Sequence, residues 1–122
     1  MKVGRWTIEG SELVFELLDS RDQTNFLYAF VSGRRVLYIG KSTQTVYRRM
    51  MGYRKPGPTQ RTNIRNNANL AEILSEGSAV EIYVLSDDQS LDYGGFRIDL
   101  AAGIENSLIS GLRPEWNLLS LK

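Results

Sequence analysis

The chain of 122 residues is long enough for one compact domain and too short for two, so residues 1–122 are predicted to form a single domain. It contains no cysteine and no histidine, which excludes disulfides, thiolate zinc sites, a cysteine nucleophile and the commonest general base. A net charge of +1 and a hydrophobic content of 42% fit a globular domain, and no apolar run reaches the ~18 residues of a membrane span. Because no apolar segment and cleavage site follow Met1, we expect a cytoplasmic protein without membrane association.

The first 25 residues are interpreted as an N-terminal extension and a candidate for added recognition surface. Within it, residues 13–18 form a short apolar run that predicts a strand or an edge segment. It is the one element that we predict there.

A hairpin is predicted from residues 27–31 and 36–39, which are rich in β-forming side chains. We expect Ser32, Gly33 and Arg34 to form its loop, with Gly33 in a left-handed conformation. This register would place Tyr28 directly opposite Tyr38. The predicted faces are Leu27, Ala29, Val31, Leu37 and Ile39 on one side, and Tyr28, Phe30, Val36 and Tyr38 on the other.

A helix is expected after the hairpin, capped by Ser42 or Thr43 and ending near residues 52–53. The Pro-Gly-Pro sequence at residues 56–58 then breaks the chain. Residues 54–69 are interpreted as a basic and polar loop insertion.

The second half of the chain predicts a short helix over residues 69–76 and a third strand over residues 80–85. Residues 86–95 are expected to be a loop, and residues 98–111 the last helix, followed by a short tail. The sum is an α/β (α+β) domain in which helices flank a small three-stranded antiparallel sheet.

Charge is distributed unevenly along the chain. Nine basic residues and no acidic residue lie from position 34 to position 65: Arg34, Arg35, Lys41, Arg48, Arg49, Arg54, Lys55, Arg61 and Arg65. Tyrosines and methionines are interleaved with these charges, which a solvated tail would not require. The segment therefore predicts a surface for a phosphate backbone.

Helical periodicity separates two adjacent arginines of that segment. Val46, Met50 and Tyr53 follow the i, i+4, i+7 spacing of an apolar stripe. Arg49 borders this stripe, whereas Arg48 lies on the far side of the helix. We therefore expect Arg49 to reach over the sheet, and Arg48 to meet solvent or phosphate.

An acidic residue, Glu105, is predicted on the apolar face of the last helix, among Ala101, Ala102, Leu108 and Ile109. Such a carboxylate is costly unless it is paired with a cation, so the pattern indicates either a salt bridge or a divalent metal site. Asn117, twelve residues later, would by itself be interpreted as a turn or cap residue.

Taken together, these positions resemble the GIY-YIG nuclease family, most closely its type II restriction endonuclease members, over roughly residues 26–117. The matching positions are Tyr28, Tyr38, Ile39, Gly40, Arg49, Tyr53, Glu105 and Asn117. Residues 56–60 and 62–63 also resemble a segment of some restriction-type members. The chain departs from the family where Phe26 and Leu27 stand in place of Gly-Ile, and where Tyr53 occupies a position that is often histidine.

The resemblance implies an endonuclease that hydrolyses DNA phosphodiester bonds with Mg²⁺, for which Mn²⁺ could substitute. Its catalytic set would comprise Tyr28, Tyr38, Lys41, Arg49, Tyr53, Glu105 and Asn117, with Glu105 as the metal ligand. One of the first two tyrosines would act as the base, with Tyr28 preferred, while the other orients water or phosphate. Nearby cations are expected to lower the tyrosine pKa, and Asn117 is expected to hold Glu105 or a neighbouring loop in position.

Double-stranded DNA is the expected partner. The residues predicted to contact it are Arg34, Arg35, Arg48, Arg54, Lys55, Gln60, Arg61, Asn63 and Arg65. Restriction-type cleavage is preferred, and the alternatives are a repair or nicking nuclease, a nucleic-acid-binding module that does not cut, and a domain that docks an acidic protein. Because restriction requires both strands to be cut, a homodimer is expected, at least on DNA.

Overall fold

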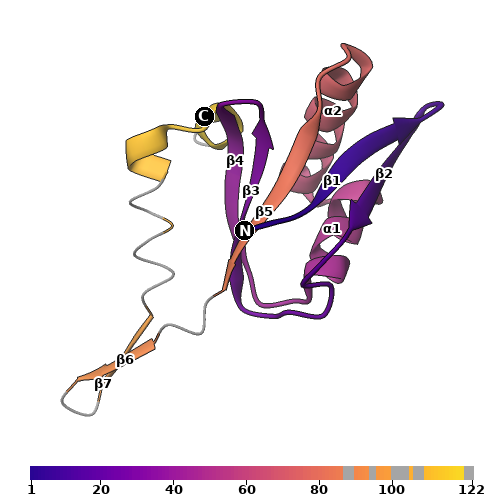
Figure 1. The fold of residues 1–122 in the computed structure, drawn as a ribbon. Coiled ribbons are helices and arrows are strands. Elements are labelled where there is room, and N and C mark those ends of the chain that lie inside the picture. The colour runs from indigo at the N-terminus through magenta and orange to yellow at the C-terminus, as the bar shows by residue number, and fades with distance from the viewer. Residues whose placement is uncertain (87–89, 94–95, 100–104, 106–108, 120–122) are drawn as a thin grey trace.

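The fold is an α+β arrangement in which helices α1 and α2 cover one face of an antiparallel sheet (Figure 1). The computed structural model describes residues 1–86, 90–93, 96–99, 105 and 109–119. No helix in these ranges is long and apolar enough to cross a membrane.

The central sheet has five strands, ordered β2-β1-β5-β3-β4 and antiparallel throughout, rather than the three predicted. The strands are β1 (Lys2–Glu9), β2 (Glu12–Leu17), β3 (Phe26–Ser32), β4 (Arg35–Ser42) and β5 (Val80–Ser86). The short apolar run of residues 13–18 is confirmed as an edge strand, β2.

The N-terminal extension is an integral part of this sheet, which corrects its interpretation as an added surface. Strand β1 lies between β2 and β5, and Val3 and Trp6 belong to the core. The Trp6 ring meets Phe15 and Phe30 in edge-on contacts with centroids 5.3 and 5.9 Å apart. Strand β1 was missed because Gly4, Arg5 and Trp6 interrupt the alternation of apolar and polar residues that identifies a half-buried strand.

The β3–β4 hairpin is confirmed, but its register is not the predicted one. Tyr28 lies opposite Gly40, and Phe30 lies opposite Tyr38, because the turn is tighter than expected and β4 contains an irregularity near Val36. Gly33 has a φ of +60°, so the left-handed turn is confirmed.

Because of the irregularity in β4, Val36 and Leu37 do not lie on the faces predicted for them. Leu37 is fully buried in the core with Tyr28 and Phe30, whereas Val36 pairs with Val31. A bulge inserts one residue and so reverses the alternation beyond it, which the sequence pattern did not reveal.

Helix α1 (Val46–Arg54) begins three to four residues after the predicted cap. Its N-cap is Thr45, whose hydroxyl accepts a hydrogen bond from the Arg48 amide at 3.2 Å. The apolar stripe is confirmed, since Val46, Met50 and Tyr53 are all fully buried.

Helix α2 (Arg61–Ser75) begins eight residues before the predicted start at residue 69. Most of the predicted loop insertion at residues 54–69 is therefore helical. The inner face of α2 is unusually polar, with Asn63, Asn66 and Leu70 buried, and these asparagines concealed the helix from a search for an apolar stripe.

The C-terminal part also differs from the prediction. Strands β6 (Ser90–Tyr93) and β7 (Phe96–Asp99) form a hairpin where a loop and the start of a helix were expected. Residues 105 and 109–112 are helical, while the remainder of the predicted last helix lies outside the described residues. Instead of a tail, α4 (Glu115–Leu119) packs against β4.

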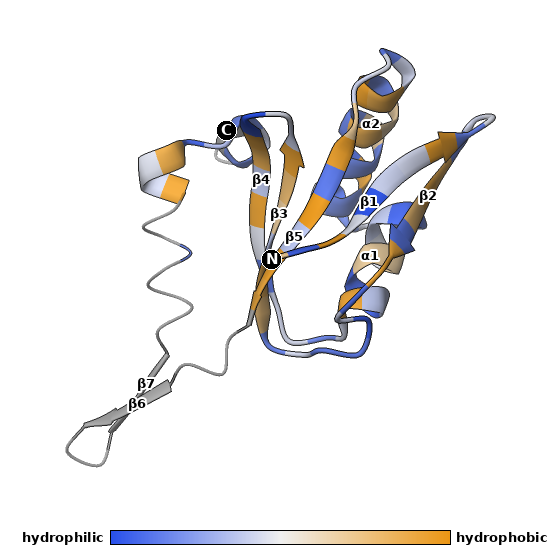
Figure 2. Ribbon diagram, viewed as in Figure 1, coloured by the Kyte–Doolittle hydropathy of each residue, from blue (hydrophilic) through white to orange (hydrophobic). Residues whose placement is uncertain are grey.

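The core lies between the sheet and the two helices. Figure 2 shows hydrophobic residues concentrated along β3, β4 and β5. Aromatic rings dominate the centre, where Phe30 contacts Tyr28, Tyr38, Tyr53 and Trp116 with centroids 5.2–6.5 Å apart. The close packing of this aromatic layer fixes the tyrosines that form the site described below.

Candidate active site

The site is built around Tyr28, which extends from β3 across β4. A Cβ atom on Gly40 would lie 2.4 Å from the Tyr28 hydroxyl oxygen, so this position accepts only glycine while the tyrosine keeps its place. The Tyr28 and Tyr38 rings are neighbours on the same face, with centroids 6.2 Å apart. The expectation that both tyrosines share one face is thus confirmed, although they do not pair directly.

Arg49 reaches over the sheet from α1, as its helical position predicted. Its Nε donates to the Tyr28 hydroxyl (3.1 Å), its Nη1 to Oδ1 of Asn63 (3.1 Å) and its Nη2 to the Tyr53 hydroxyl (2.6 Å). All three acceptors are neutral, so these contacts fix the guanidinium without cancelling its charge. Arg48, in contrast, is exposed.

Tyr28 and Tyr53 are both held inside the fold. Their hydroxyl groups are hydrogen-bonded to each other, and each accepts from Arg49. Burial raises the pKa of Tyr28 and of Tyr53 above the ordinary tyrosine value, although the charge of Arg49 acts in the opposite direction. Arg49 thus acts on the pKa of Tyr28 in the expected direction, but desolvation outweighs the cation and the pKa is raised overall.

Tyr38 is partly exposed, and charges from separate elements act on it. Burial raises its pKa above the ordinary value, and the carboxylate of Glu105 acts in the same direction. The Tyr53 hydroxyl, Arg49 and Arg65 act to lower the pKa of Tyr38. These effects bring Arg65 and Glu105, which are 40 residues apart in the chain, into the neighbourhood of one phenol.

Asn117 is buried beside the free edge of β4. Its Oδ1 accepts from the Ile39 amide and its Nδ2 donates to the Ile39 carbonyl, both at 2.8 Å. Since Ile39 lies between Tyr38 and Gly40, this pair of bonds anchors the strand segment that carries the site. Asn117 thus holds a strand, and the role predicted for it beside Glu105 or a neighbouring loop stays a prediction.

Lys41 occupies a different position from the other predicted catalytic residues. It pairs with Leu27, whereas Gly40 pairs with Tyr28, so strand alternation directs Lys41 away from the tyrosine face. The proposed role of Lys41 beside Tyr28 is not supported by this register.

The predicted nucleic-acid-binding residues fall into separate groups. Arg54 and Lys55 end α1, and Gln60 and Arg61 begin α2, so these four surround one loop. At the far end of the hairpin, Arg35 forms an exposed ion pair with Glu115 at 2.5 Å, next to Arg34 in the turn.

Two predicted DNA contacts are drawn into the interior instead. Asn63 is 8% exposed and binds Arg49. Arg65 is partly buried, and its Nη1 has no hydrogen-bond partner among the residues that the structure describes. Asn66, which is 1% exposed, was missed altogether. The spacing of Asn63, Asn66 and Leu70 would have identified it if the helix had been started at residue 61.

A divalent metal fits the available residues in one respect. Mg²⁺ in nucleases is commonly held by one or two carboxylates together with water and substrate phosphates, so it does not require a cage of protein ligands. Glu105 is a partly buried carboxylate near Tyr38. In the described part of the chain, no group of three or more acidic, histidine or cysteine residues gathers into an alternative metal site.

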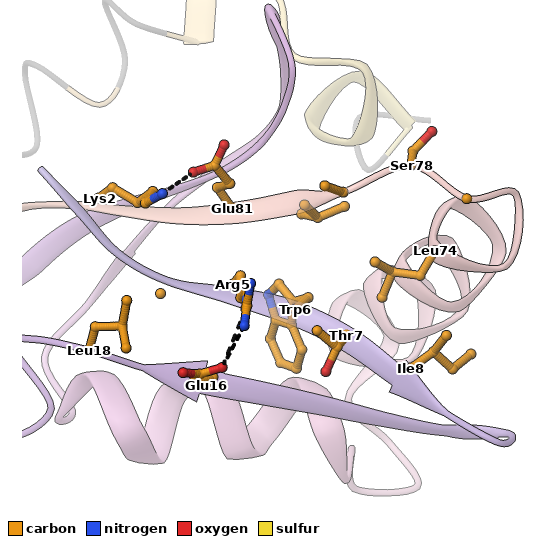
Figure 3. A pocket seen from close by; sticks show the side chains of 14 residues that line it. Lys2, Arg5, Trp6, Thr7, Ile8, Glu16, Leu18, Leu74, Ser78 and Glu81 are labelled. Atoms are coloured by element: carbon orange, nitrogen blue, oxygen red, sulfur yellow. Dashed lines mark hydrogen bonds and ion pairs between the residues drawn. The ribbon is translucent and has the colours of Figure 1, made fainter.

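A groove of about 550 Å³ lies elsewhere, beside β1 and the end of α2 (Figure 3). Two ion pairs line it, Lys2 with Glu81 at 2.8 Å and Arg5 with Glu16 at 3.1 Å. None of the predicted catalytic or DNA-binding residues contributes to its wall. Its charges are paired with each other, so we do not assign it to the site.

Comparisons with known proteins were made for the sequence and for the fold. No family model matches the chain. The sequence is 26% identical over 110 residues to the UvrABC system protein C of Wolinella succinogenes, covering 89% of this chain and 16% of that protein. The chain therefore spans about one sixth of the length of this relative.

Two solved structures are similar in fold. An alanine mutant of EndoII from bacteriophage T4 superimposes with a TM-score of 0.70 and 21% identity, covering 96% of this chain and 90% of that chain. The restriction endonuclease HPY188I, in complex with product DNA, gives a TM-score of 0.56 and 16% identity, covering 91% of this chain and 75% of that chain. With the sheet, the tyrosine pair and Arg49 arranged as described, the chain has the GIY-YIG nuclease fold.

Proposed function

We propose that this protein is a DNA endonuclease that hydrolyses phosphodiester bonds with a divalent metal ion. The observation that carries the proposal is Arg49, a cation held by three neutral acceptors next to the tyrosine pair. A purely structural arginine at this depth would gain more from a carboxylate partner than from three hydroxyl and amide oxygens. Its uncancelled charge suits a phosphate group.

In the proposed reaction, a water oxygen attacks the phosphorus atom and the bond to the 3′ oxygen breaks. The products are a 5′-phosphate and a 3′-hydroxyl. Arg49 donates to the phosphoryl oxygens, where charge accumulates in the transition state. Arg65 adds a second positive charge on the Tyr38 side.

We assign the proton-accepting role to Tyr38 rather than to Tyr28. Tyr28 is 2% exposed, and its hydroxyl is occupied by Arg49 and Tyr53. Tyr38 is partly exposed, and the charges of both Arg65 and Glu105 act on it. A general base must reach the attacking water, so accessibility decides between two phenols whose pKa values are both raised.

Glu105 is the residue that would hold the metal ion. A bound Mg²⁺, for which Mn²⁺ could substitute, supplies Lewis acidity to the phosphate and offsets charge on the leaving oxygen. The carboxylate by itself raises the pKa of Tyr38. A cation bound to Glu105 would reverse that influence and favour the phenolate.

Double-stranded DNA is the proposed substrate, and restriction-type cleavage is the first candidate. HPY188I is a restriction endonuclease determined with product DNA.

The test is cleavage of supercoiled plasmid and phage DNA with and without Mg²⁺. We expect EDTA and Glu105→Ala to abolish cutting while DNA binding persists. Glu115→Gln is the matched control, because Glu115 is an exposed acid that forms an ion pair with Arg35. Binding without cutting by the wild-type protein would instead support a non-cleaving nucleic-acid module.

The products distinguish restriction from nicking. Discrete linear bands indicate sequence-specific cutting of both strands, which a two-fold symmetric homodimer on DNA would perform. Nicked circles as the end product, from a protein that light scattering shows to be monomeric on DNA, would favour the repair or nicking alternative.

A further inference from the structure

A chain of side-chain hydrogen bonds runs from the loop before α2 to Arg49. The Gly57 amide donates to Oε1 of Gln60 at 2.8 Å. The same oxygen accepts from Nδ2 of Asn63 at 3.1 Å, and Oδ1 of Asn63 accepts from Nη1 of Arg49 at 3.1 Å. The chain thus links the backbone of the loop to the guanidinium through two neutral amides.

Asn63, the middle member of this series of hydrogen bonds, is closely packed. Asn63 is 8% exposed, and its carboxamide oxygen and nitrogen both have partners in the chain. A Cβ atom on Gly52 would lie 3.4 Å from both Arg49 Nη1 and Asn63 Nδ2, so α1 and α2 meet closely at this glycine. A Cβ atom on Gly57 would lie 3.2 Å from the Gln60 carboxamide. A side chain at Gly57 would thus crowd the Gln60 carboxamide, whereas one at Gly52 would make an ordinary van der Waals contact.

Both amides were predicted from the sequence to contact DNA. The geometry points to a different role, because both amide atoms of Asn63 and the carboxamide oxygen of Gln60 already have partners within the protein. Loss of Asn63 would leave Arg49 with its tyrosine partners alone, and loss of Gln60 would leave the Asn63 amide without the acceptor that holds it. A guanidinium has five donors in a rigid plane, so a third partner restricts its orientation further than two partners do.

We propose that Gln60 and Asn63 are positioning residues that hold Arg49 in register with the phosphate, and that they do so by tying it to the Gly57 backbone. The role for catalysis rests on the proposed endonuclease function. The loop is also flanked by Lys55 and Arg61, both exposed. DNA that contacts these residues and shifts the loop would therefore shift Arg49 as well.

The first test separates positioning from DNA contact. Gln60→Ala is expected to lower the single-turnover rate at saturating DNA by roughly 10-fold to 10²-fold, because small displacements of a catalytic group cost rates of this size. The Kd for DNA should stay within about two-fold. Ser75→Ala, an exposed change at the other end of α2, is the control and should change neither quantity.

The second test uses the acceptor chemistry of Gln60. Gln60→Glu keeps an oxygen for Gly57 and Asn63, so it should recover most of the rate that Gln60→Ala loses. If Gln60 contacted DNA phosphates, the added negative charge would weaken binding further than alanine does. Weaker binding of Gln60→Glu than of Gln60→Ala, with an unchanged rate in both, would overturn the proposal.

A third measurement does not depend on cleavage. Hydrogen exchange of the Arg49 Nε–H, followed by NMR in the free protein, reports the bond to Tyr28. We expect faster exchange in Asn63→Ala, Gln60→Ala and Gly57→Ala than in the wild type and in Ser75→Ala. If the wild-type protein cuts no DNA and these exchange rates still rise, positioning of Arg49 stands while the endonuclease function fails. Unchanged exchange in all three variants would refute the positioning role itself.

Discussion

Basic residues from one stretch of sequence lie in two regions of the fold, one partly buried and one exposed to solvent. Arg49 and Arg65 lie partly buried beside the tyrosines, where their charges act on Tyr38. Arg35 lies at the other end of the hairpin, 64% exposed at the side chain and paired with Glu115. An exposed pair of this kind is screened by water and contributes little. The number of charges therefore says less about function than the groups among which the fold places them.

The largest effect is expected at Tyr38, the tyrosine on which the charges of Arg65 and Glu105 act. Tyr38→Phe should reduce the single-turnover rate by about 10²-fold to 10⁴-fold, the range for loss of a general base. Because burial raises the pKa of Tyr38, the phenolate is the minor form at neutral pH and its fraction increases as pH rises. The wild-type rate should thus increase about tenfold per pH unit between pH 6 and 9.

The same pH profile decides between the two tyrosines. In Tyr38→Phe the dependence on pH should disappear, whereas Tyr28→Phe should keep it at a lower rate, since Tyr28 supports Arg49. A profile that flattens only in Tyr28→Phe would return the role of base to Tyr28.

The next effect distinguishes the buried arginine from its exposed neighbour. Arg49→Ala should lower the rate by about 10²-fold to 10³-fold, as loss of a transition-state charge partner commonly does. Arg49→Lys should recover only part of this loss, because a lysine cannot reproduce the three planar contacts. If Arg49→Lys were as active as the wild type, a positive charge at this position would be sufficient for the reaction and the planar contacts would not be required.

A smaller effect is expected on stability from the strand anchor. Asn117→Ala removes both buried bonds to Ile39 and should lower the free energy of unfolding by about 1–3 kcal/mol. Urea unfolding, with Glu115→Ala on the same helix as control, measures the loss. Faster amide exchange at Ile39 should accompany it, and an unchanged exchange rate there would argue against the anchor.

The smallest effects are expected for two exposed arginines, Arg48 on α1 and Arg35 at the hairpin turn. Arg48→Ala should weaken DNA binding by a few-fold and reduce the slope of log K against log salt by roughly one. Arg35→Ala should change the slope less, because its charge is shared with Glu115. Filter binding across a salt series compares the slopes of the two variants. A larger change of slope in Arg35→Ala than in Arg48→Ala would indicate that DNA lies over the hairpin turn.

Local sequence was sufficient for several features of the fold. The helical period alone placed Arg49 over the sheet and Arg48 outward, and both positions are confirmed. Alternation in β3 predicted that Tyr28 and Tyr38 share a face, and Gly33 identified the hairpin turn. These features depend on neighbours within one or two turns or on adjacent strands, and their geometry is fixed by the backbone.

Long-range packing decided the rest. The insertion of β1 between β2 and β5, the bulge in β4, and the polar inner face of α2 all depend on partners distant in sequence. The direction of the Tyr28 pKa likewise follows from burial, which no local pattern reports. The sequence by itself determined which residues could perform the chemistry, because their types and spacing are local properties. The tertiary structure decided which of them share one environment, because desolvation and hydrogen-bond partners exist only once the elements have packed together.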